Sequence, residues 1–191
     1  VASFDLFCAG AFSTSATDRL RADANGLAAF SADALATGFQ VSDTNPLVGL
    51  EGRAALMRRL GATVAANPAV FGRADDPRPG GLFDHLAAQV EHGVLPAEAI
   101  LTALLTHLGP IWPGRISLGG IDLGDTWRHP ALVTDDATTG LVPFHKLSQW
   151  LAYSLIEPLQ WAGIGVAGID GLTGLAEYRN GGLFIDTGVI A

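Results

Sequence analysis

Apolar residues recur at every third or fourth position along much of this sequence. The clearest run spans 48–66, where the recurring residues are Leu50, Ala54, Met57, Leu60 and Val64. This spacing puts apolar side chains on one face of an α-helix, so it predicts a helix that buries that face. The same pattern predicts helices over 80–91, 96–108 and 143–162, and short helices over 27–36. We therefore expect a mainly α fold.

Glycine and proline interrupt this helical pattern. Residues 114–130 are too rich in glycine for a stable helix, so they predict a shaped loop or a short hairpin. Pro158 is expected to kink or split the last long helix, and a short strand is expected at 183–186. Together these features predict a single helical domain over 1–191 with one glycine-rich loop region.

The length and composition fit one globular domain. The 191 residues match the size of a single domain, and a hydrophobic content of 49% excludes intrinsic disorder. Charged residues make up only 16%, the sequence starts at Val1 without a methionine, and it stops inside an apolar run. We therefore expect a fragment of a longer chain, with an absent N-terminal half or an oligomer partner covering part of its surface.

Several classes of partner are excluded by simple properties of the sequence. The formal net charge of −8 repels phosphate backbones, which excludes nucleic acid. No segment has the roughly 20 consecutive apolar residues that a membrane span needs. Cys8 is the only cysteine, which excludes an internal disulfide and a multi-thiolate metal site and favours the cytoplasm. No metal-ligand spacing and no phosphate-binding or dinucleotide-binding glycine motif is present, so neither a metal nor a cofactor is expected.

A polar and aromatic stripe accompanies the apolar stripe of the helix predicted over 143–162. Its members lie three or four positions apart: Lys146, Gln149, Trp150, Tyr153 and Glu157. Aromatic rings beside a cation suit a flat polar ligand, but packing at the edge of the core explains the same pattern equally well. Both interpretations stay open.

Two further groups of ionisable residues are candidates for chemistry. Glu177, Tyr178 and Arg179 lie between apolar residues and a glycine pair, so Glu177 is either a catalyst with a tuned pKa or half of an ion pair with Arg179. Physical chemistry alone favours the ion pair. Asp122 and Asp125, in the glycine-rich segment, are candidates for binding sugar hydroxyls, although capping of turns is the favoured interpretation.

Five segments resemble the uracil-catabolism protein 4 family of fungi and bacteria. They are 4–13, 40–53, 109–115, Val142-Pro-Phe-His-Lys-Leu-Ser-Gln-Trp-Leu151 and Leu172-Thr-Gly-Leu-Ala-Glu-Tyr-Arg-Asn-Gly-Gly182. The resemblance extends over nearly the whole chain. It implies a cytoplasmic protein of uracil utilisation that carries a domain of unknown function. It also implies a longer parent chain, since members of the family extend beyond both ends of this sequence.

A second, more distant resemblance concerns the last third of the chain. Residues 144–149 and 172–179 are similar to two motifs of the queuosine-salvage N-glycosylases, which are helical proteins distantly related in shape to DNA glycosylases. Lys146 matches the motif lysine, Glu177 replaces the motif aspartate, and Tyr178 and Arg179 match their counterparts. This resemblance implies a distantly DNA-glycosylase-like fold and a carboxylate at Glu177 that acts on an N-ribosyl bond.

The function expected from both resemblances is a hydrolase that cleaves the N-ribosyl bond of a ureido-ribose or of its 5-phosphate. Such cleavage needs a carboxylate near the ribose and a proton for the leaving nitrogen. Glu177 is the expected catalytic residue, and the expected substrate-binding residues are Lys146, Gln149, Trp150, Tyr153, Tyr178, Arg179, Asp122 and Asp125. The alternative is a non-catalytic component of the pathway that binds a nucleotide-like ligand or a partner enzyme. An amidohydrolase is disfavoured because the sequence offers no set of metal ligands.

Overall fold

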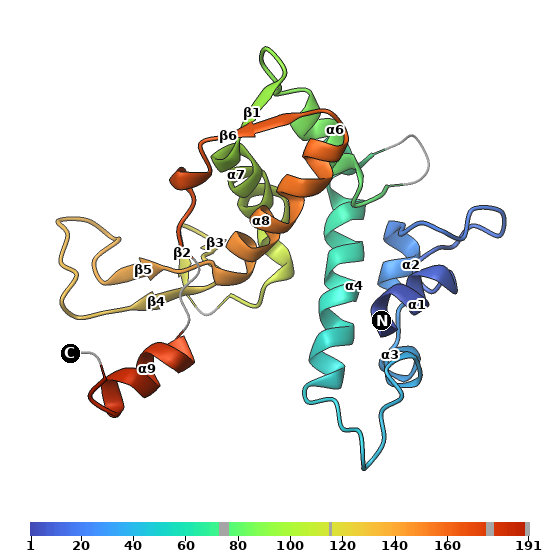
Figure 1. The fold of residues 1–191 in the computed structure, drawn as a ribbon, viewed down its shortest axis with the longest axis horizontal. Coiled ribbons are helices and arrows are strands. Elements are labelled where there is room, and N and C mark those ends of the chain that lie inside the picture. Colours follow the sequence, from blue (N-terminus) through green and yellow to red (C-terminus); the bar gives the residue numbers. More distant parts are fainter. Residues whose placement is uncertain (73–76, 115, 175–177, 190–191) are drawn as a thin grey trace.

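A computed structural model gives the fold of this chain. It describes residues 1–72, 77–114, 116–174 and 178–189, with the backbone alone for residues 178–181. The long helix α4 (Leu50–Ala66) stands between a small group of N-terminal helices and a larger group of helices and short strands, as Figure 1 shows.

The N-terminal group consists of α1 (Ala2–Cys8), α2 (Ala24–Ala28) and α3 (Ala32–Gly38). α2 and α3 pack against α4, and α1 packs against α3. α2 and α4 approach closely because Gly61 of α4 has no side chain. A Cβ at this position would lie only 2.5 Å from the backbone oxygen of Ala24. The glycine therefore lets the two helix backbones touch, and a larger residue would push them apart.

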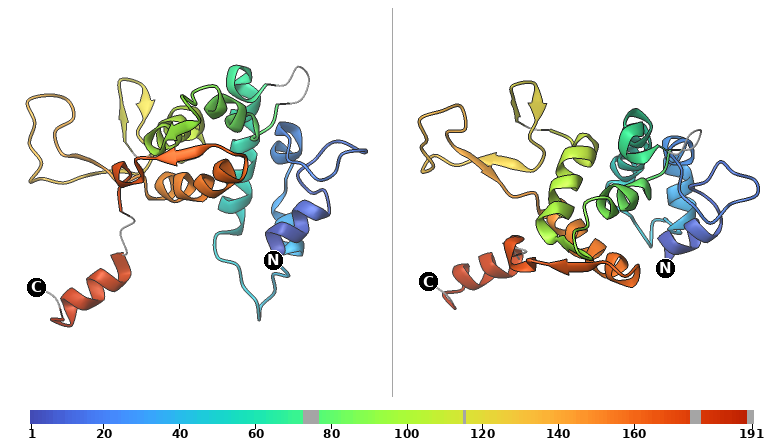
Figure 2. Two further views of the ribbon diagram at one scale, coloured as in Figure 1. Left: turned by 45° about the horizontal axis from the view of Figure 1, so that its top comes forward. Right: turned by 90° about the horizontal axis from the view of Figure 1, so that it is seen from above.

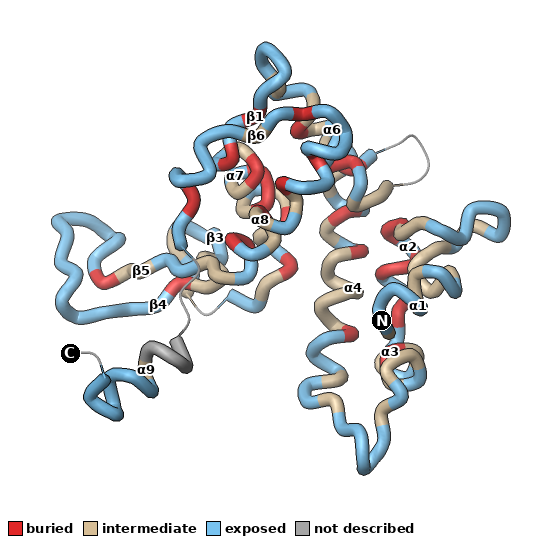
Figure 3. The backbone as a smooth tube through the Cα atoms, in the orientation of Figure 1, coloured by how far each residue is buried: buried red, intermediate tan, exposed pale blue. Residues whose placement is uncertain are grey.

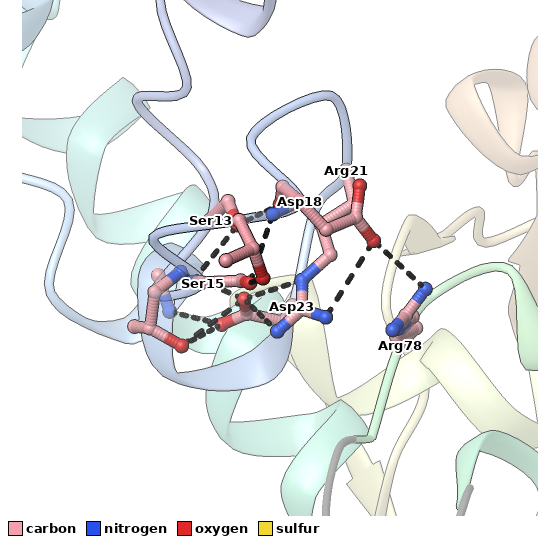
Figure 4. A network of polar contacts seen from close by, with 9 residues as sticks. Ser13, Ser15, Asp18, Arg21, Asp23 and Arg78 are labelled. Atoms are coloured by element: carbon pink, nitrogen blue, oxygen red, sulfur yellow. Dashed lines mark hydrogen bonds and ion pairs between the residues drawn. The ribbon is translucent and has the colours of Figure 1, made fainter.

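A buried carboxylate organises the chain that leads into α2. Asp23, only 1% exposed, caps this helix by accepting a hydrogen bond from the Gly26 N–H at 2.8 Å. It also accepts from the Thr14 N–H at 2.8 Å and pairs with Arg21 at 3.2 Å. Burial alone raises the pKa of Asp23, but the hydrogen bonds from Gly26, Thr14 and Arg21 bring this pKa below its ordinary value. Figure 4 shows how the network continues to Asp18 and from there to Arg78.

The larger group is built around α7 (Ala97–Leu108) and α8 (Lys146–Trp161), which pack against each other. Shorter helices complete it: α5 (Pro68–Phe71), α6 (Gly81–Ala87) and the 3-10 turns η1 (Gly109–Ile111) and η2 (Ile169–Gly171). On α7 the buried residues are Ala97, Ile100, Ala103, Leu104 and Leu108, which follow the predicted helical spacing. The buried segments in Figure 3 lie mainly on α7 and α8, with others on α2, α6 and the C-terminal half of α4.

The described residues also contain three two-stranded sheets. One is parallel and two are antiparallel, and their strands are β1 (Val94–Pro96) with β6 (Gly165–Ala167), β2 (Ser117–Leu118) with β3 (Ile121–Asp122), and β4 (Thr126–Arg128) with β5 (Leu141–Pro143). The turn of the β2–β3 hairpin is Gly119-Gly120, with φ of 58° and 80°. Two successive left-handed residues give the turn geometry that suits a tight hairpin, and glycine adopts it without strain. Of the two structures predicted for the glycine-rich segment, a shaped loop or a short hairpin, the structure shows a short hairpin.

The expectation of a mainly α, distantly DNA-glycosylase-like domain is wrong. The chain is mostly helical, but its fold is mixed α/β. The physical reason is the length and location of the strands. A strand of two or three residues has no alternating pattern to detect, and β1 pairs with a strand that comes about 70 residues later in the chain.

Two local predictions are corrected as well. Residues 183–186, expected as a strand, belong to the helix α9 (Tyr178–Asp186), which Figures 1 and 2 show at the edge of the molecule. Pro158 does not split α8, which continues to Trp161. Pro158 lies in the last turn of α8, so the N–H that it lacks removes only one bond near the helix end. No helix in the described part of the chain is both long enough and apolar enough to cross a membrane.

Candidate functional site

Two adjoining cavities lie where the β2–β5 segment meets the first turn of α8. The larger has a volume of about 360 Å³ and a mostly apolar lining, with Leu105 of α7 in its wall. The smaller has a volume of about 230 Å³ and extends over the start of α8. Both cavities are lined by Trp112, Gly124 and His145, so these three residues mark their junction. Partly enclosed, mostly apolar spaces with a few polar groups are typical of small-molecule sites, and the larger cavity lies within their usual size range.

Trp112 is held at the junction by α4. It follows directly on η1, and the Arg59 side chain of α4 donates a hydrogen bond of 2.8 Å from Nε to the backbone oxygen of Ile111. The indole packs against the buried core with one side and borders both cavities. A rigid aromatic ring in this place can cover a flat ligand group.

Asp125 connects the β-segment to the start of α8. Its backbone oxygen accepts from the N–H groups of Phe144 at 3.0 Å and His145 at 3.3 Å. Its carboxylate accepts from the Lys146 N–H at 3.2 Å and from the Trp127 indole N–H at 2.9 Å. The residue thus caps α8 from outside the helix, a role that the sequence did not predict, and it also lines the smaller cavity.

His145 is the N-cap of α8 and has a left-handed backbone with φ of 47°. This conformation costs a non-glycine residue roughly 1–3 kcal/mol and persists only where the surroundings enforce it. Here the two backbone hydrogen bonds to Asp125 enforce it. Burial lowers the pKa of His145, and the charge of Asp125 counteracts this only in part, so the pKa lies below the ordinary histidine value. The imidazole at the junction is therefore neutral at neutral pH and can accept a proton.

Asp122 is exposed at the end of the β2–β3 hairpin and lines the larger cavity. Its carboxylate accepts a short hydrogen bond from the Ser117 hydroxyl on the paired strand. The two aspartates named from the sequence are thus brought to the same region, one in each cavity. His145 lies between them as a third ionisable group.

The predicted stripe on α8 does not form one uniform face. Lys146 is half-buried next to His145, whereas Gln149 is only 7% exposed and its Oε1 accepts no hydrogen bond from the residues that the structure describes. Trp150 is 51% exposed. Tyr153 is half-buried, and its hydroxyl donates to the backbone oxygen of Thr173 at 3.4 Å.

The second predicted motif falls largely outside the described residues. Glu177 is not described, and Tyr178 and Arg179 begin α9 with their backbones alone. The expectation that Lys146, Glu177 and Arg179 line one cavity therefore stays a prediction. Among the described side chains, no group of three or more His, Cys, Asp or Glu residues is placed to hold a metal ion.

The comparisons with known proteins identify the family. Residues 1–191 match the family described as a protein of unknown function, DUF1688. The chain belongs to this family. Two curated relatives are similar over the whole chain: "Uracil catabolism protein 4" of Lachancea kluyveri at 42% identity and "Protein urg3" of Schizosaccharomyces pombe at 41%. The resemblance to the uracil-catabolism protein 4 family is thus confirmed.

The chain spans less than half the length of these relatives, 45% of the first and 44% of the second. No solved structure matches it. The distant similarity to queuosine-salvage N-glycosylases is not among the findings and stays a prediction.

Sequence reasoning missed three residues of this site: Trp112, His145 and Ser148. The signal for two of them was present, because His145 and Ser148 lie within the family motif 142–151 at the start of a predicted helix. Ser148 was not singled out, because it lacks the Gly-x-Ser-x-Gly context of a serine nucleophile. Trp112 lies in the motif 109–115, but nothing in the local sequence places it beside residues 124 and 145.

Proposed function

We propose that this protein acts in uracil catabolism, in the cytoplasm, as a hydrolase of the N-ribosyl bond in a ureido-ribose or its 5-phosphate. The name of the Lachancea kluyveri relative supports the pathway, since the two sequences are 42% identical over the whole chain. The geometry of the two joined cavities supports the type of reaction. The substrate has two unlike halves, a ribose and a planar ureide, and the site has two unlike compartments.

The observation that carries this proposal is the position of His145 at the junction. If the ribose occupies the larger cavity and the ureide the smaller one, the bond between them lies next to the imidazole. A neutral imidazole beside the anomeric carbon is suited to take a proton from an attacking water. The depressed pKa of His145 keeps the imidazole in this form at neutral pH.

The proposed reaction consumes one water. The water oxygen bonds to the anomeric carbon as the carbon–nitrogen bond breaks, and the leaving nitrogen gains a proton to give urea and the free sugar. Positive charge develops on the ribose in the transition state, so a nearby carboxylate lowers the barrier. Glu177 remains the candidate for this carboxylate from the N-glycosylase resemblance, and Asp122 is the candidate among the residues that line the larger cavity.

The remaining expected residues keep their proposed roles. Lys146 and Arg179 are the candidates for a 5-phosphate, because cationic side chains bind phosphate by charge-assisted hydrogen bonds. Trp112, which lines the smaller cavity, joins Trp150 and Tyr153 as a candidate for stacking on the planar half of the substrate. Asp122 can in addition hold a ribose hydroxyl.

The test is an assay on the full-length protein. Ribosylurea and its 5-phosphate are incubated with it, and released urea and reducing sugar are quantified over time. We expect equimolar release of the two products from at least one of these substrates. Saturable binding of both compounds without any release of urea would refute the hydrolase and would favour the alternative, a non-catalytic ligand-binding component of the pathway.

A further inference from the structure

The smaller cavity contains a serine hydroxyl that has no hydrogen-bond partner among the described residues. Ser148 is only 4% exposed and lines this cavity, and its hydroxyl makes no hydrogen bond with any residue that the structure describes. The hydroxyl oxygen is not fully enclosed by protein atoms, so it is free to donate to or accept from a group in the cavity. A hydroxyl in this condition at a cavity wall is typical of a group that meets a ligand.

The neighbouring groups of the same cavity add both hydrogen-bond donors and an acceptor. The backbone N–H groups of Leu147 and Ser148, in the first turn of α8, have no acceptor among the described residues. Asp125 supplies the acceptor, since each of its carboxylate oxygens has accepted one hydrogen bond and has room for another. Donors and an acceptor thus lie side by side on one wall.

The charge of this cavity selects against an anionic ligand. Asp125 is negative, and the described residues that line the cavity include no lysine or arginine to compensate for it. A phosphate or a carboxylate would meet this charge at close range in a partly enclosed space. A neutral group with adjacent N–H and C=O functions avoids the repulsion and satisfies both kinds of partner.

We propose that the smaller cavity is a subsite for a ureide group. The ureide carbonyl accepts from the Ser148 hydroxyl and the first-turn N–H groups, its terminal NH2 donates to Asp125, and its plane stacks on Trp112. This assignment rests on the proposed function, because it takes the ureide half of the proposed substrate as the ligand. It goes further in fixing the orientation: the ureide lies over the start of α8 and the sugar lies in the larger cavity.

The experiment uses two ligands that cannot be hydrolysed at a glycosidic bond. Cyclopentylurea carries the ureide on a ring of ribose size, and N-cyclopentylacetamide replaces the terminal NH2 by a methyl group. Dissociation constants are measured by titration NMR on the full-length protein, the Ser148→Ala variant and the Ser154→Ala variant. Ser154 is the matched control, because it lies on the same helix but is exposed and donates to the Trp150 backbone oxygen.

We expect Ser148→Ala to weaken the binding of cyclopentylurea about three- to tenfold, as for the loss of one neutral hydrogen bond, while Ser154→Ala has no effect. The acetamide should bind at least about tenfold more weakly than the urea, since it lacks the donor to the Asp125 carboxylate. Because Ser148 has no described partner, its replacement should leave the melting temperature unchanged. Equal affinity of the two ligands, or equal affinity of the wild type and Ser148→Ala, would overturn the subsite.

The urea-release assay separates this inference from the proposed function. Release of urea from ribosylurea with the same KM in Ser148→Ala and the wild type would leave the hydrolase intact and overturn the ureide subsite. Ser148-dependent binding of cyclopentylurea without any release of urea would support the subsite and refute the hydrolase.

Discussion

Replacement of Asp23 by asparagine should remove a large part of the stability of the N-terminal helices. Asparagine keeps one acceptor oxygen but turns the other into an amide, which faces donors that it cannot bond. In the structure one carboxylate oxygen accepts from the Gly26 N–H, and the other accepts from both the Thr14 N–H and Arg21. The variant therefore loses two charge-assisted bonds, each worth about 1.5–3 kcal/mol, and leaves two donors without an acceptor. We expect a loss of about 3–5 kcal/mol.

Urea denaturation followed by circular dichroism measures this loss. Asp18→Asn is the matched control, because Asp18 also pairs with Arg21 but at 3.7 Å and with a half-exposed side chain. Exposed pairs of this kind contribute about 0–1 kcal/mol, so the control should be close to the wild type. If the two variants unfold at the same urea concentration, the assignment of stability to the buried network is wrong.

The same residue predicts a dependence of stability on pH. The folded pKa of Asp23 lies below its unfolded value, so folding favours the charged form. This contribution is fully present above the unfolded pKa, near pH 4, and is lost as the pH falls through the folded pKa. The wild type should therefore lose stability relative to Asp23→Asn as the pH falls below about 4, the ordinary aspartate value. A constant difference between the two proteins over this range would contradict the proposed cause of the pKa shift.

Three further predictions concern the start of α8 and Glu177. Gln149→Met removes a buried oxygen that has no described partner. The free energy of unfolding in urea should therefore stay constant or rise by up to about 1 kcal/mol, and a fall of that size would reveal a partner for this oxygen. His145→Gln should lower kcat for ribosylurea by about 10²–10⁴, and the acid limb of the wild-type kcat/KM profile should lie below the ordinary histidine pKa, because only neutral His145 accepts a proton. If the wild-type rate does not depend on pH between 5 and 8 and His145→Gln has the wild-type kcat, His145 is not the base. Glu177→Gln should lower turnover by orders of magnitude at a nearly constant melting temperature if Glu177 stabilises the ribose charge, whereas a structural ion pair predicts a lower melting temperature and normal turnover.

Helices with a buried face of several turns could be predicted from the sequence. The helix expected over 48–66 is α4, and that expected over 96–108 is α7, with boundaries within two residues. The helix expected over 143–162 begins three residues later than predicted. The reason is a tertiary contact. Asp125, 20 residues earlier in the chain, holds His145 in a left-handed conformation, so the helix cannot extend N-terminally beyond Lys146.

The strands could not be predicted for a related reason. β1 consists of three residues, and its strand partner β6 comes about 70 residues later in the chain, beyond the helix α8. α9 shows the opposite error, since a short strand was expected at 183–186, where three consecutive residues are apolar. In the structure these side chains are exposed on a helix, so apolar character alone did not indicate the conformation.

Asp125 explains why the sequence pointed to part of this site but left its role open. Turn capping and ligand binding were alternatives for this residue, yet the structure gives it a capping contact to Lys146 and a place in the smaller cavity. A substitution of Asp125 would therefore disturb the start of α8 and the cavity together, and a loss of activity would not separate the two roles. Ser148 separates them, because it lines the same cavity and no described contact requires its hydroxyl. Ser148→Ala is therefore the variant that best tests ligand binding in the smaller cavity, because it changes the cavity wall without removing a described hydrogen bond.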